Sequence, residues 1–333
     1  MRNLIVSNLE KCMGCNRCIS TCPVPEANVA RMEGENNKVS IDNKKCIACG
    51  ACLRSCQHGV RDFVDDTASF FADLRQGKPI SLFFAPASRS NLENWGRILT
   101  LLRNLGVRKV YDVSLGADIC TWANIRHIQK KNPPSVITQP CPVIVNYILK
   151  HRPALLPYLS PAQSPMLCTA IYMRKYQGIT EKLAALSPCI AKSDEFEDTG
   201  GLVSYNVTFL KLEEYIKEHH LVLPEKESGY DHIDCALGSI FPMPGGLKEN
   251  VEFMIGKKMR IDKSEGQGVV YRALDAFARE PAENLPALFD VLNCPEGCNL
   301  GTGCRHVKNI FRSECGHGQS AAKRGERAGS RVF

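Results

Sequence analysis

The sequence predicts a small, cysteine-rich α+β domain followed by a larger α/β domain with mostly parallel sheets. Eight of the 17 cysteines fall in two similarly spaced blocks near the N-terminus. Beyond about residue 78, apolar runs typical of buried strands alternate with segments of helical periodicity. Strands that alternate with helices favour parallel sheets flanked by helices. The length of 333 residues allows two or three domains with a sizeable core.

Each cysteine block has the spacing C-x2-C-x2-C-x3-C. The first block is Cys12, Cys15, Cys18 and Cys22, followed by Pro23, and the second is Cys46, Cys49, Cys52 and Cys56. Bacterial ferredoxins use this spacing to hold two 4Fe-4S clusters, with three ligands from one block and the fourth from the other. The pattern therefore assigns one cluster to Cys12, Cys15, Cys18 and Cys56, and the other to Cys46, Cys49, Cys52 and Cys22.

Zinc sites and disulfides are the alternatives, because C-x2-C pairs occur in both. A structural zinc ion needs only four ligands. Here each set takes three cysteines from one block and one from the other, and a proline follows Cys22, which differs from the usual arrangement of a zinc site. The spacing therefore favours iron-sulfur clusters, and the chain is expected to transfer electrons.

The remaining composition indicates a reducing compartment. The sequence has neither a charged-then-apolar leader nor an apolar run near the ~18 residues that a membrane span needs. We therefore expect a cytoplasmic protein without a membrane contact. The formal net charge is +7, of which residues 311–333 contribute +3 through five basic and two acidic side chains. This charge distribution predicts no nucleic-acid partner.

The elements expected along the chain define three segments. Residues 1–78 form the cluster domain, with short strands at 4–7 and 38–42. Residues 79–310 form the α/β domain, with strands expected at 80–86, 107–113, 136–138, 184–187 and 288–292, and helices at 92–105, 118–131, 166–176 and 208–219. Residues 311–333 have almost no large apolar side chain, which predicts a flexible basic tail.

Four further cysteines lie in segments bounded by proline and glycine. The segments are ThrGlnProCysPro at 138–142, SerProCysIleAlaLys at 187–192 and AsnCysProGluGlyCysAsnLeuGlyThrGly at 293–303, and the cysteines are Cys141, Cys189, Cys294 and Cys298. Stiff turns of this kind can aim a thiolate and turn backbone N–H groups toward cluster sulfurs. Several strands end directly in such a motif, where ligand sites of α/β folds gather. The alternative is that these are buried core thiols.

These three segments resemble the three signatures of the iron-only (FeFe) hydrogenases, written TSCCP, MPCxxK and MACxxGCxxGGG. Their order is kept, and so is the C-x3-C spacing of the third. The resemblance extends to AlaProAla at 85–87, GlyAlaAsp at 116–118 and SerPro at 164–165. It implies an α+β ferredoxin-like two-cluster domain, followed by an α/β H-cluster domain of two lobes with mostly parallel sheets.

The resemblance also implies a cofactor and an activity. The cofactor is an H-cluster, a 4Fe-4S cube linked to a two-iron subsite that carries CO, cyanide and an azadithiolate. By position, Cys141, Cys189, Cys294 and Cys298 hold the cube and Cys298 bridges to the two-iron subsite, while Lys192 bonds a cyanide and Pro86, Ala87 and Pro165 line the pocket. The implied activity is reversible H2 oxidation and proton reduction. The implied partners are H2 and protons, a redox partner such as ferredoxin or a signalling domain, and maturation enzymes.

Some positions depart from the family pattern. Pro140 stands where the family has a proton-relay thiol, and Ala123 and Asn124 stand where acidic residues are expected. Ser187 and Leu292 replace methionines, and Met166 replaces a glutamine. This combination resembles the hydrogenases assigned a sensory role, so slow turnover is expected. Such proteins often continue into a PAS domain; none follows here, which predicts a truncated or replaced C-terminal part.

Two alternatives to the enzyme remain. One is a non-catalytic cluster-binding protein like the eukaryotic relatives in iron-sulfur assembly, and the other is a ferredoxin-like carrier fused to an inert α/β domain. Lys192 and AlaProAla at 85–87 favour the hydrogenase, because a lysine aimed at cyanide has no use without cyanide. We interpret the remaining candidates as structural: core thiols at Cys120, Cys168 and Cys235, unpaired thiols or an extra cluster at Cys304 and Cys315, surface or packing histidines at His58 and His306, and core apolar side chains over 241–259. Glu195 fits the end of the second motif, and a solvated acid at a helix start is the alternative.

Overall fold

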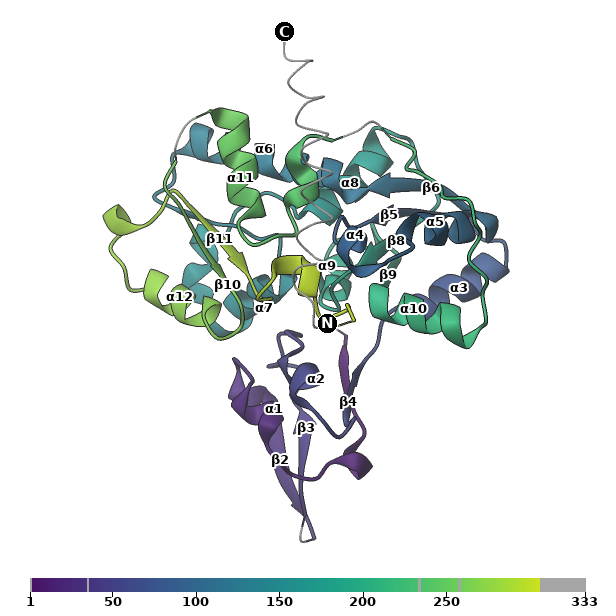
Figure 1. The fold of residues 1–333 in the computed structure, drawn as a ribbon. Coiled ribbons are helices and arrows are strands. Elements are labelled where there is room, and N and C mark those ends of the chain that lie inside the picture. The colour runs from purple at the N-terminus through teal and green to yellow at the C-terminus, as the bar shows by residue number, and fades with distance from the viewer. Residues whose placement is uncertain (1, 35, 233–234, 257–258, 306–333) are drawn as a thin grey trace.

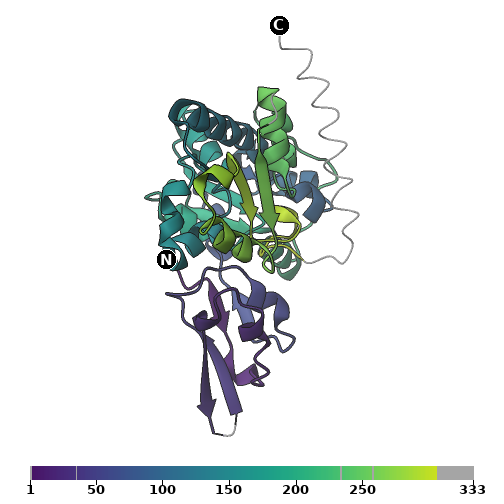
Figure 2. The same ribbon diagram turned by 90° about the vertical axis from the view of Figure 1, so that its left-hand side faces the viewer.

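The computed structural model describes residues 2–34, 36–232, 235–256 and 259–305. Figures 1 and 2 show a small N-terminal domain, drawn in purple, beneath a larger body of two lobes. The predicted tail at 311–333, Cys315 and His306 lie outside the described residues. None of the helices within the described ranges is long and apolar enough to cross a membrane.

The bounds of the elements are as follows. The strands are β1 Ile5–Ser7, β2 Asn28–Glu33, β3 Asn36–Ile41, β4 Arg61–Phe63, β5 Ile80–Phe84, β6 Val107–Asp112, β7 Val136–Ile137, β8 Lys182–Ser187, β9 Tyr205–Thr208, β10 Ile261–Glu265 and β11 Leu288–Leu292. The α-helices are α1 Arg17–Ser20, α2 Ala51–Ser55, α3 Thr67–Arg75, α4 Ser88–Asn91, α5 Trp95–Asn104, α6 Val113–Lys131, α7 Pro142–His151, α8 Pro165–Lys175, α9 Lys192–Glu197, α10 Phe209–Glu218, α11 Gly246–Ile255 and α12 Val270–Phe277. The short 3-10 helices include η3 Pro153–Tyr158, η4 Leu237–Ile240 and η6 Gly297–Leu300.

The small domain is built from two antiparallel strand pairs, β1 with β4 and β2 with β3. The predicted strands at 4–7 and 38–42 correspond to β1 and β3. The sequence analysis missed β2, because most of its side chains are exposed and it lacks an apolar alternation. Apolar side chains of this domain, among them Ile5 and Ile47, share one hydrophobic cluster with Ile144 and Val291 of the larger body. The small domain therefore docks through a common core.

One lobe, on the right of Figure 1, contains a four-stranded parallel sheet of order β6-β5-β8-β9. All five residues of β5 are buried, as the continuous apolar run predicts for a strand covered on both faces. Helix α3 packs Phe70, Phe71 and Leu74 into the core of this lobe. Helix α3, which precedes the predicted boundary at residue 78, thus packs on the larger body.

The other lobe contains a parallel sheet of order β10-β11-β7, so parallel sheets flanked by helices are confirmed for the larger body. Each strand and helix expected between residues 80 and 292 has a counterpart. Strand β10 was missed because Asp262 and Lys263, two consecutive exposed charged residues at the edge of the sheet, interrupt the alternation of apolar and polar residues. Helices α7, α11 and α12 were missed as well, although the buried side chains of α12 follow helical spacing.

Helix α6 begins at Val113, before the predicted start at 118. Asp112 causes the early start, because its carboxylate accepts a hydrogen bond from the Ser114 backbone N–H at 2.9 Å and so caps the helix. Gly116 lies where α6 crosses α8, and a Cβ at this position would come within 2.1 Å of the Pro165 carbonyl oxygen. The GlyAlaAsp segment therefore lets two helices approach closely.

A buried ion pair joins the start of α6 to α4. The Arg89 guanidinium donates to the Asp112 carboxylate, and their side chains are only 6% and 1% exposed. Burial alone would raise the pKa of Asp112, but the Arg89 charge and the Ser114 hydrogen bonds lower it below its usual value. The pair therefore fixes the β5–α4 loop against the N-terminus of α6.

We predict that Arg89→Met destabilises the protein by about 3–5 kcal/mol, because it leaves the Asp112 charge buried without its cation. The matched control is Arg103→Met, which breaks a half-exposed ion pair with Asp231 in the same lobe and should cost about 1 kcal/mol or less. Anaerobic urea denaturation measures both. Equal shifts in the two variants would contradict the role given to the buried pair.

Candidate metal-cluster sites

The three cysteine segments meet around one cavity between the two lobes. The cavity is lined by Ala85, Pro86, Ala87, Val113, Ala117, Pro140, Cys141, Pro142, Val143, Pro165, Met166, Pro188, Cys189, Lys192, Phe241, Pro242, Leu292, Asn293, Cys294, Gly297, Cys298 and Gly301. These residues include all four cysteines of the predicted cube. Lys192 is the one charged side chain among these lining residues. The walls are otherwise almost entirely apolar.

Each cysteine segment follows the carboxyl end of a strand. Cys189 comes two residues after β8 in one lobe, and Cys294 two residues after β11 in the other. Cys141 follows β7, the neighbour of β11, and is the residue that precedes α7. Because parallel strands end at the same edge of a sheet, the segments of both lobes face the interlobe space. The structure thus brings together the cysteines that the sequence analysis grouped.

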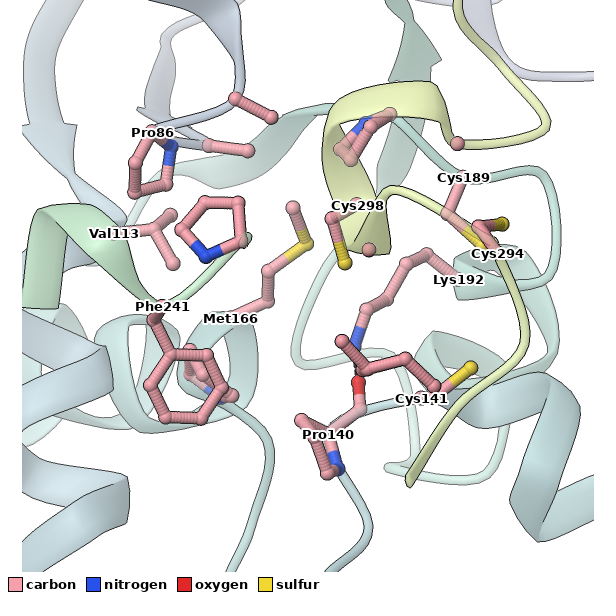
Figure 3. A pocket seen from close by; sticks show the side chains of 18 of the residues that line it. Pro86, Val113, Pro140, Cys141, Met166, Cys189, Lys192, Phe241, Cys294 and Cys298 are labelled. Carbon is pink, nitrogen blue, oxygen red and sulfur yellow. Dashed lines mark hydrogen bonds between the residues drawn. The ribbon is translucent and has the colours of Figure 1, made fainter. Parts of the chain in front are cut away.

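Cys298 occupies a distinct position in this cavity. Figure 3 shows Cys141, Cys189 and Cys294 to one side of it and Pro86, Val113 and Phe241 to the other. Cys298 lies on η6. It therefore separates a cysteine-lined half of the cavity from an apolar half.

The four thiols are poorly hydrated. Burial raises the pKa of Cys189 to about 12 and that of Cys294 to about 11, and it raises the pKa of Cys298 well above its usual value. Such groups are neutral thiols at pH 7 unless a bound cation stabilises the thiolates. Within the described ranges, no group of three His, Cys, Asp or Glu side chains was found that could hold a single metal ion.

Backbone contacts lock the second cysteine segment against the third. A Cβ at Gly301 would lie 2.1 Å from the Pro188 carbonyl oxygen, so only glycine permits this approach. The same carbonyl accepts a hydrogen bond from the Gly303 N–H at 2.8 Å. The Thr302 hydroxyl accepts from the Ile190 N–H at 3.0 Å. The glycine-rich end of the third segment thereby sets the distance between Cys189 and Cys298.

Lys192 lies at the start of α9 with only 7% of its side chain exposed. Its ammonium donates to the Pro140 carbonyl oxygen at 3.1 Å and to the Glu195 carboxylate at 2.7 Å. Burial alone would lower the pKa of Lys192, but Glu195 raises it above the usual value, so the lysine stays charged. Glu195, which fits the end of the second motif and for which a solvated helix-start acid was the alternative, is the ion-pair partner of this cation, with 13% of its side chain exposed.

The apolar half of the cavity contains the residues predicted to line it and others that were missed. Pro86 and Ala87 follow β5, and Pro165 is the first residue of α8. The analysis missed Val113 and Phe241, which complete this wall. Phe241 was assigned to an ordinary core because nothing in its local sequence marks a cavity.

The positions that depart from the family pattern are also part of this region. Pro140 lines the cavity. Asn124 is buried, accepts from the Ser160 hydroxyl at 2.7 Å and donates to the Cys120 carbonyl oxygen at 2.9 Å. Ser187 donates to the Asn206 amide oxygen at 2.6 Å. These polar groups are satisfied locally, and neither Pro140 nor Asn124 carries an ionisable side chain.

The small domain groups its cysteines in the two interleaved sets that the spacing predicts. Cys12, Cys15, Cys18 and Cys56 line one small cavity, together with His58 and Arg61. Cys22, Cys46, Cys49 and Cys52 form the other set. Burial raises the pKa of Cys49 well above its usual value, and the other three thiols of the set raise it further. Every cysteine that the structure describes is a free thiol rather than part of a disulfide.

The second cysteine block of the small domain lies directly against the third cysteine segment. The Cys49 carbonyl oxygen accepts from Gln267 Nε2 at 2.7 Å and from Asn293 Nδ2 at 3.2 Å. Asn293 Nδ2 also lies 3.5 Å from the Cys294 sulfur. One amide therefore contacts a cysteine residue of each site. The sequence analysis missed Asn293 and Gln267, because only the tertiary fold brings them to Cys49.

Two observations test whether these sites fit iron-sulfur clusters. Each site offers four thiols, the donor set that such clusters use, and the thiols of the interlobe site are buried or half-buried. Each site also has a buried cation, Lys192 between the lobes and Arg61 in the small domain. An anionic cluster with thiolate ligands is the natural neighbour of such a charge. The residues present therefore fit the clusters.

Comparisons with known proteins agree with the fold and with the motifs. A family model described as "Iron only hydrogenase large subunit, C-terminal domain" matches residues 78–282, and one described as "4Fe-4S dicluster domain" matches residues 4–57. Iron hydrogenase 1 of Clostridium pasteurianum is 27% identical over 177 residues, which cover 46% of this chain and 30% of that protein. The match thus spans less than a third of the relative.

Solved structures of FeFe hydrogenases have a similar fold. A structure that reports stepwise H-cluster assembly matches with a TM-score of 0.60 at 17% identity, covering 78% of this chain and 88% of its own. A variant of FeFe hydrogenase HydA1 from Chlamydomonas reinhardtii has a TM-score of 0.59 at 17% identity and the same coverage. With the first family model matching more than half of the residues, the chain belongs to the iron-only hydrogenase family, and residues 4–57 are similar to the 4Fe-4S dicluster domain.

Proposed function

We propose that this protein binds an H-cluster between its two lobes and catalyses reversible H2 oxidation and proton reduction. The observation that supports this most is the convergence of Cys141, Cys189, Cys294 and Cys298 on one buried cavity that also contains Lys192. When bound, the cofactor would supply the site and the base at which H2 is cleaved. The chain would supply ligands, orientation, exclusion of water and an electron route.

The geometry suits particular roles for individual residues. Cys298, between the two halves of the cavity, would hold both the cube and the two-iron subsite. Lys192 would donate to a cyanide ligand, which is reasonable for a buried ammonium beside an anionic group. Pro86, Ala87 and Pro165 would keep the surroundings of the two-iron subsite apolar. Without competing water, polar interactions with the cofactor are strengthened.

Electrons would pass through the two clusters of the small domain. The set that includes Cys49 lies beside Cys294 through Asn293, so it is the inner station. The set that includes Cys15 is the outer station, because that cysteine is exposed. A redox partner such as ferredoxin, or a signalling domain, would exchange electrons at this outer end. We propose a cytoplasmic location, since the free thiols suit a reducing compartment.

The lining of the cavity supports slow turnover and a sensory role. Pro140 has no proton to give, and Asn124 is a buried amide held by Ser160 and Cys120. A proton path without titratable groups is slow. The rival function is a non-catalytic cluster-binding protein of iron-sulfur assembly. The buried Lys192 at the cavity wall favours the hydrogenase over that rival, because Pro140 and Glu195 accept from the ammonium and its third N–H is left for a cyanide ligand.

The first test of this function replaces the proposed bridge. We expect Cys298→Ala to lose H2 uptake and evolution more than 100-fold after maturation, because it removes the tether of the two-iron subsite, while the small-domain clusters remain. The matched control is Cys304→Ala, which removes a buried thiol of the same segment that points to the Pro188 carbonyl oxygen and should keep the activity.

Activity is measured with redox dyes, and iron content is measured before maturation, when three cubes correspond to about twelve irons. H2 uptake retained in Cys298→Ala would contradict the assignment of the bridge. An iron content near eight in the parent protein would mean that the larger body holds no cube, and it would favour the ferredoxin-like carrier.

The second test restores a relay group. Pro140→Cys should place a thiol in the cavity and raise the rate of hydrogen-deuterium exchange by about tenfold, well below the full effect of a general acid. Pro140→Ala is the control, because it frees the backbone without adding a proton donor. Adding Asn124→Glu to Pro140→Cys should raise the rate further. If Pro140→Cys and Pro140→Ala behave alike at equal cofactor loading, proton transfer at this position does not limit turnover.

A further inference from the structure

Arg61, at the start of β4, is a buried cation in the small domain. Only 8% of the residue is exposed. Its guanidinium donates to the Ser7 hydroxyl, to Asn28 Oδ1 at 3.3 Å and toward the Cys18 sulfur at 3.5 Å. No carboxylate forms an ion pair with it in the part of the chain that the structure describes, although other buried cations such as Arg89 and Lys192 have one.

Hydrogen bonds to neutral oxygens do not neutralise this charge. A buried guanidinium without an anion is costly, and proteins retain one where a negative group is nearby. Arg61 lines the same cavity as Cys12, Cys15, Cys18 and Cys56, whose thiols become negative when they bind a cation. Its contact toward Cys18 brings the guanidinium to 3.5 Å from one of these sulfurs.

We propose that Arg61 is the counter-charge of the small-domain cluster held by these four cysteines and raises its reduction potential. The inference deepens the proposed function and depends on it, because it requires that the eight cysteines hold two cubes. Reduction adds one electron, and so one negative charge, to a cube. A fixed cation in a poorly hydrated site stabilises the reduced form and raises the potential.

The two clusters should respond unequally. Only the first set receives a hydrogen bond from Arg61, through Cys18, and hydrogen bonds to cluster sulfurs raise the potential as well. The outer cluster, which includes exposed Cys15, should therefore depend on Arg61 more than the inner one. An elevated outer potential would favour electron flow away from the interlobe site, the direction of H2 oxidation.

The test is an anaerobic redox titration followed by electron paramagnetic resonance on the full chain with its clusters. Arg61→Gln keeps donors near Ser7 and Asn28 but removes the charge. We expect its potentials to fall, with at least a tenfold change in the reduction equilibrium of the outer cluster, or about 59 mV for one electron. Arg61→Lys keeps the charge and should restore most of the shift.

The matched control is Arg31→Gln, which makes the same change in net charge at an exposed position on β2 and should leave the potentials unchanged. Equal potentials in Arg61→Gln and the parent protein, at full iron content, would overturn the inference. If Arg61→Gln binds too little iron to titrate, the Arg61→Lys variant decides between the outcomes. Full iron content and parent potentials in Arg61→Lys would support the counter-charge role. Loss of the clusters in Arg61→Lys as well would overturn that role. Absence of cubane signals in the parent protein would instead contradict the proposed function.

Discussion

Four cysteines from three distant turns share one cavity from which water is largely excluded, and this arrangement governs the rest of the larger body. Burial raises the pKa of Cys189 and Cys294 far above neutrality, so the thiols gain their charge only when iron binds. Cys189 comes from one lobe and Cys294 from the other. A cluster bound by these cysteines would therefore hold the lobes together, and folding and metal binding are expected to be coupled.

The buried cations complement these thiols. Lys192 is held in place by Glu195 and by the Pro140 carbonyl oxygen, which fixes its ammonium at the cavity wall. Arg61 has no carboxylate partner within the described residues and is stabilised by neutral oxygens and a sulfur. The difference suits two tasks. In the proposed function Lys192 would be aimed at one ligand, whereas Arg61 would supply charge beside the outer cluster.

Much of the fold and of the candidate sites could be predicted from local sequence. Cluster geometry dictates the cysteine spacing, so both interleaved sets and the interlobe set were predictable. The buried run of β5 and the glycine at Gly116 also have local causes. By contrast, Asn293, Arg61 and Phe241 act through neighbours that are distant in sequence. Helix α3 packs on the larger body, and its amphipathic sequence does not show which core it covers.

Infrared spectroscopy of the matured protein tests the central claim most directly, because CO and cyanide ligands absorb where protein groups do not. The account predicts CO and cyanide stretching bands in the parent protein, and it predicts that the cyanide bands shift in Lys192→Met, since the ammonium would no longer donate to that ligand. Absence of these bands after maturation, in protein with a full complement of cubes, would contradict the account and favour the non-catalytic alternative.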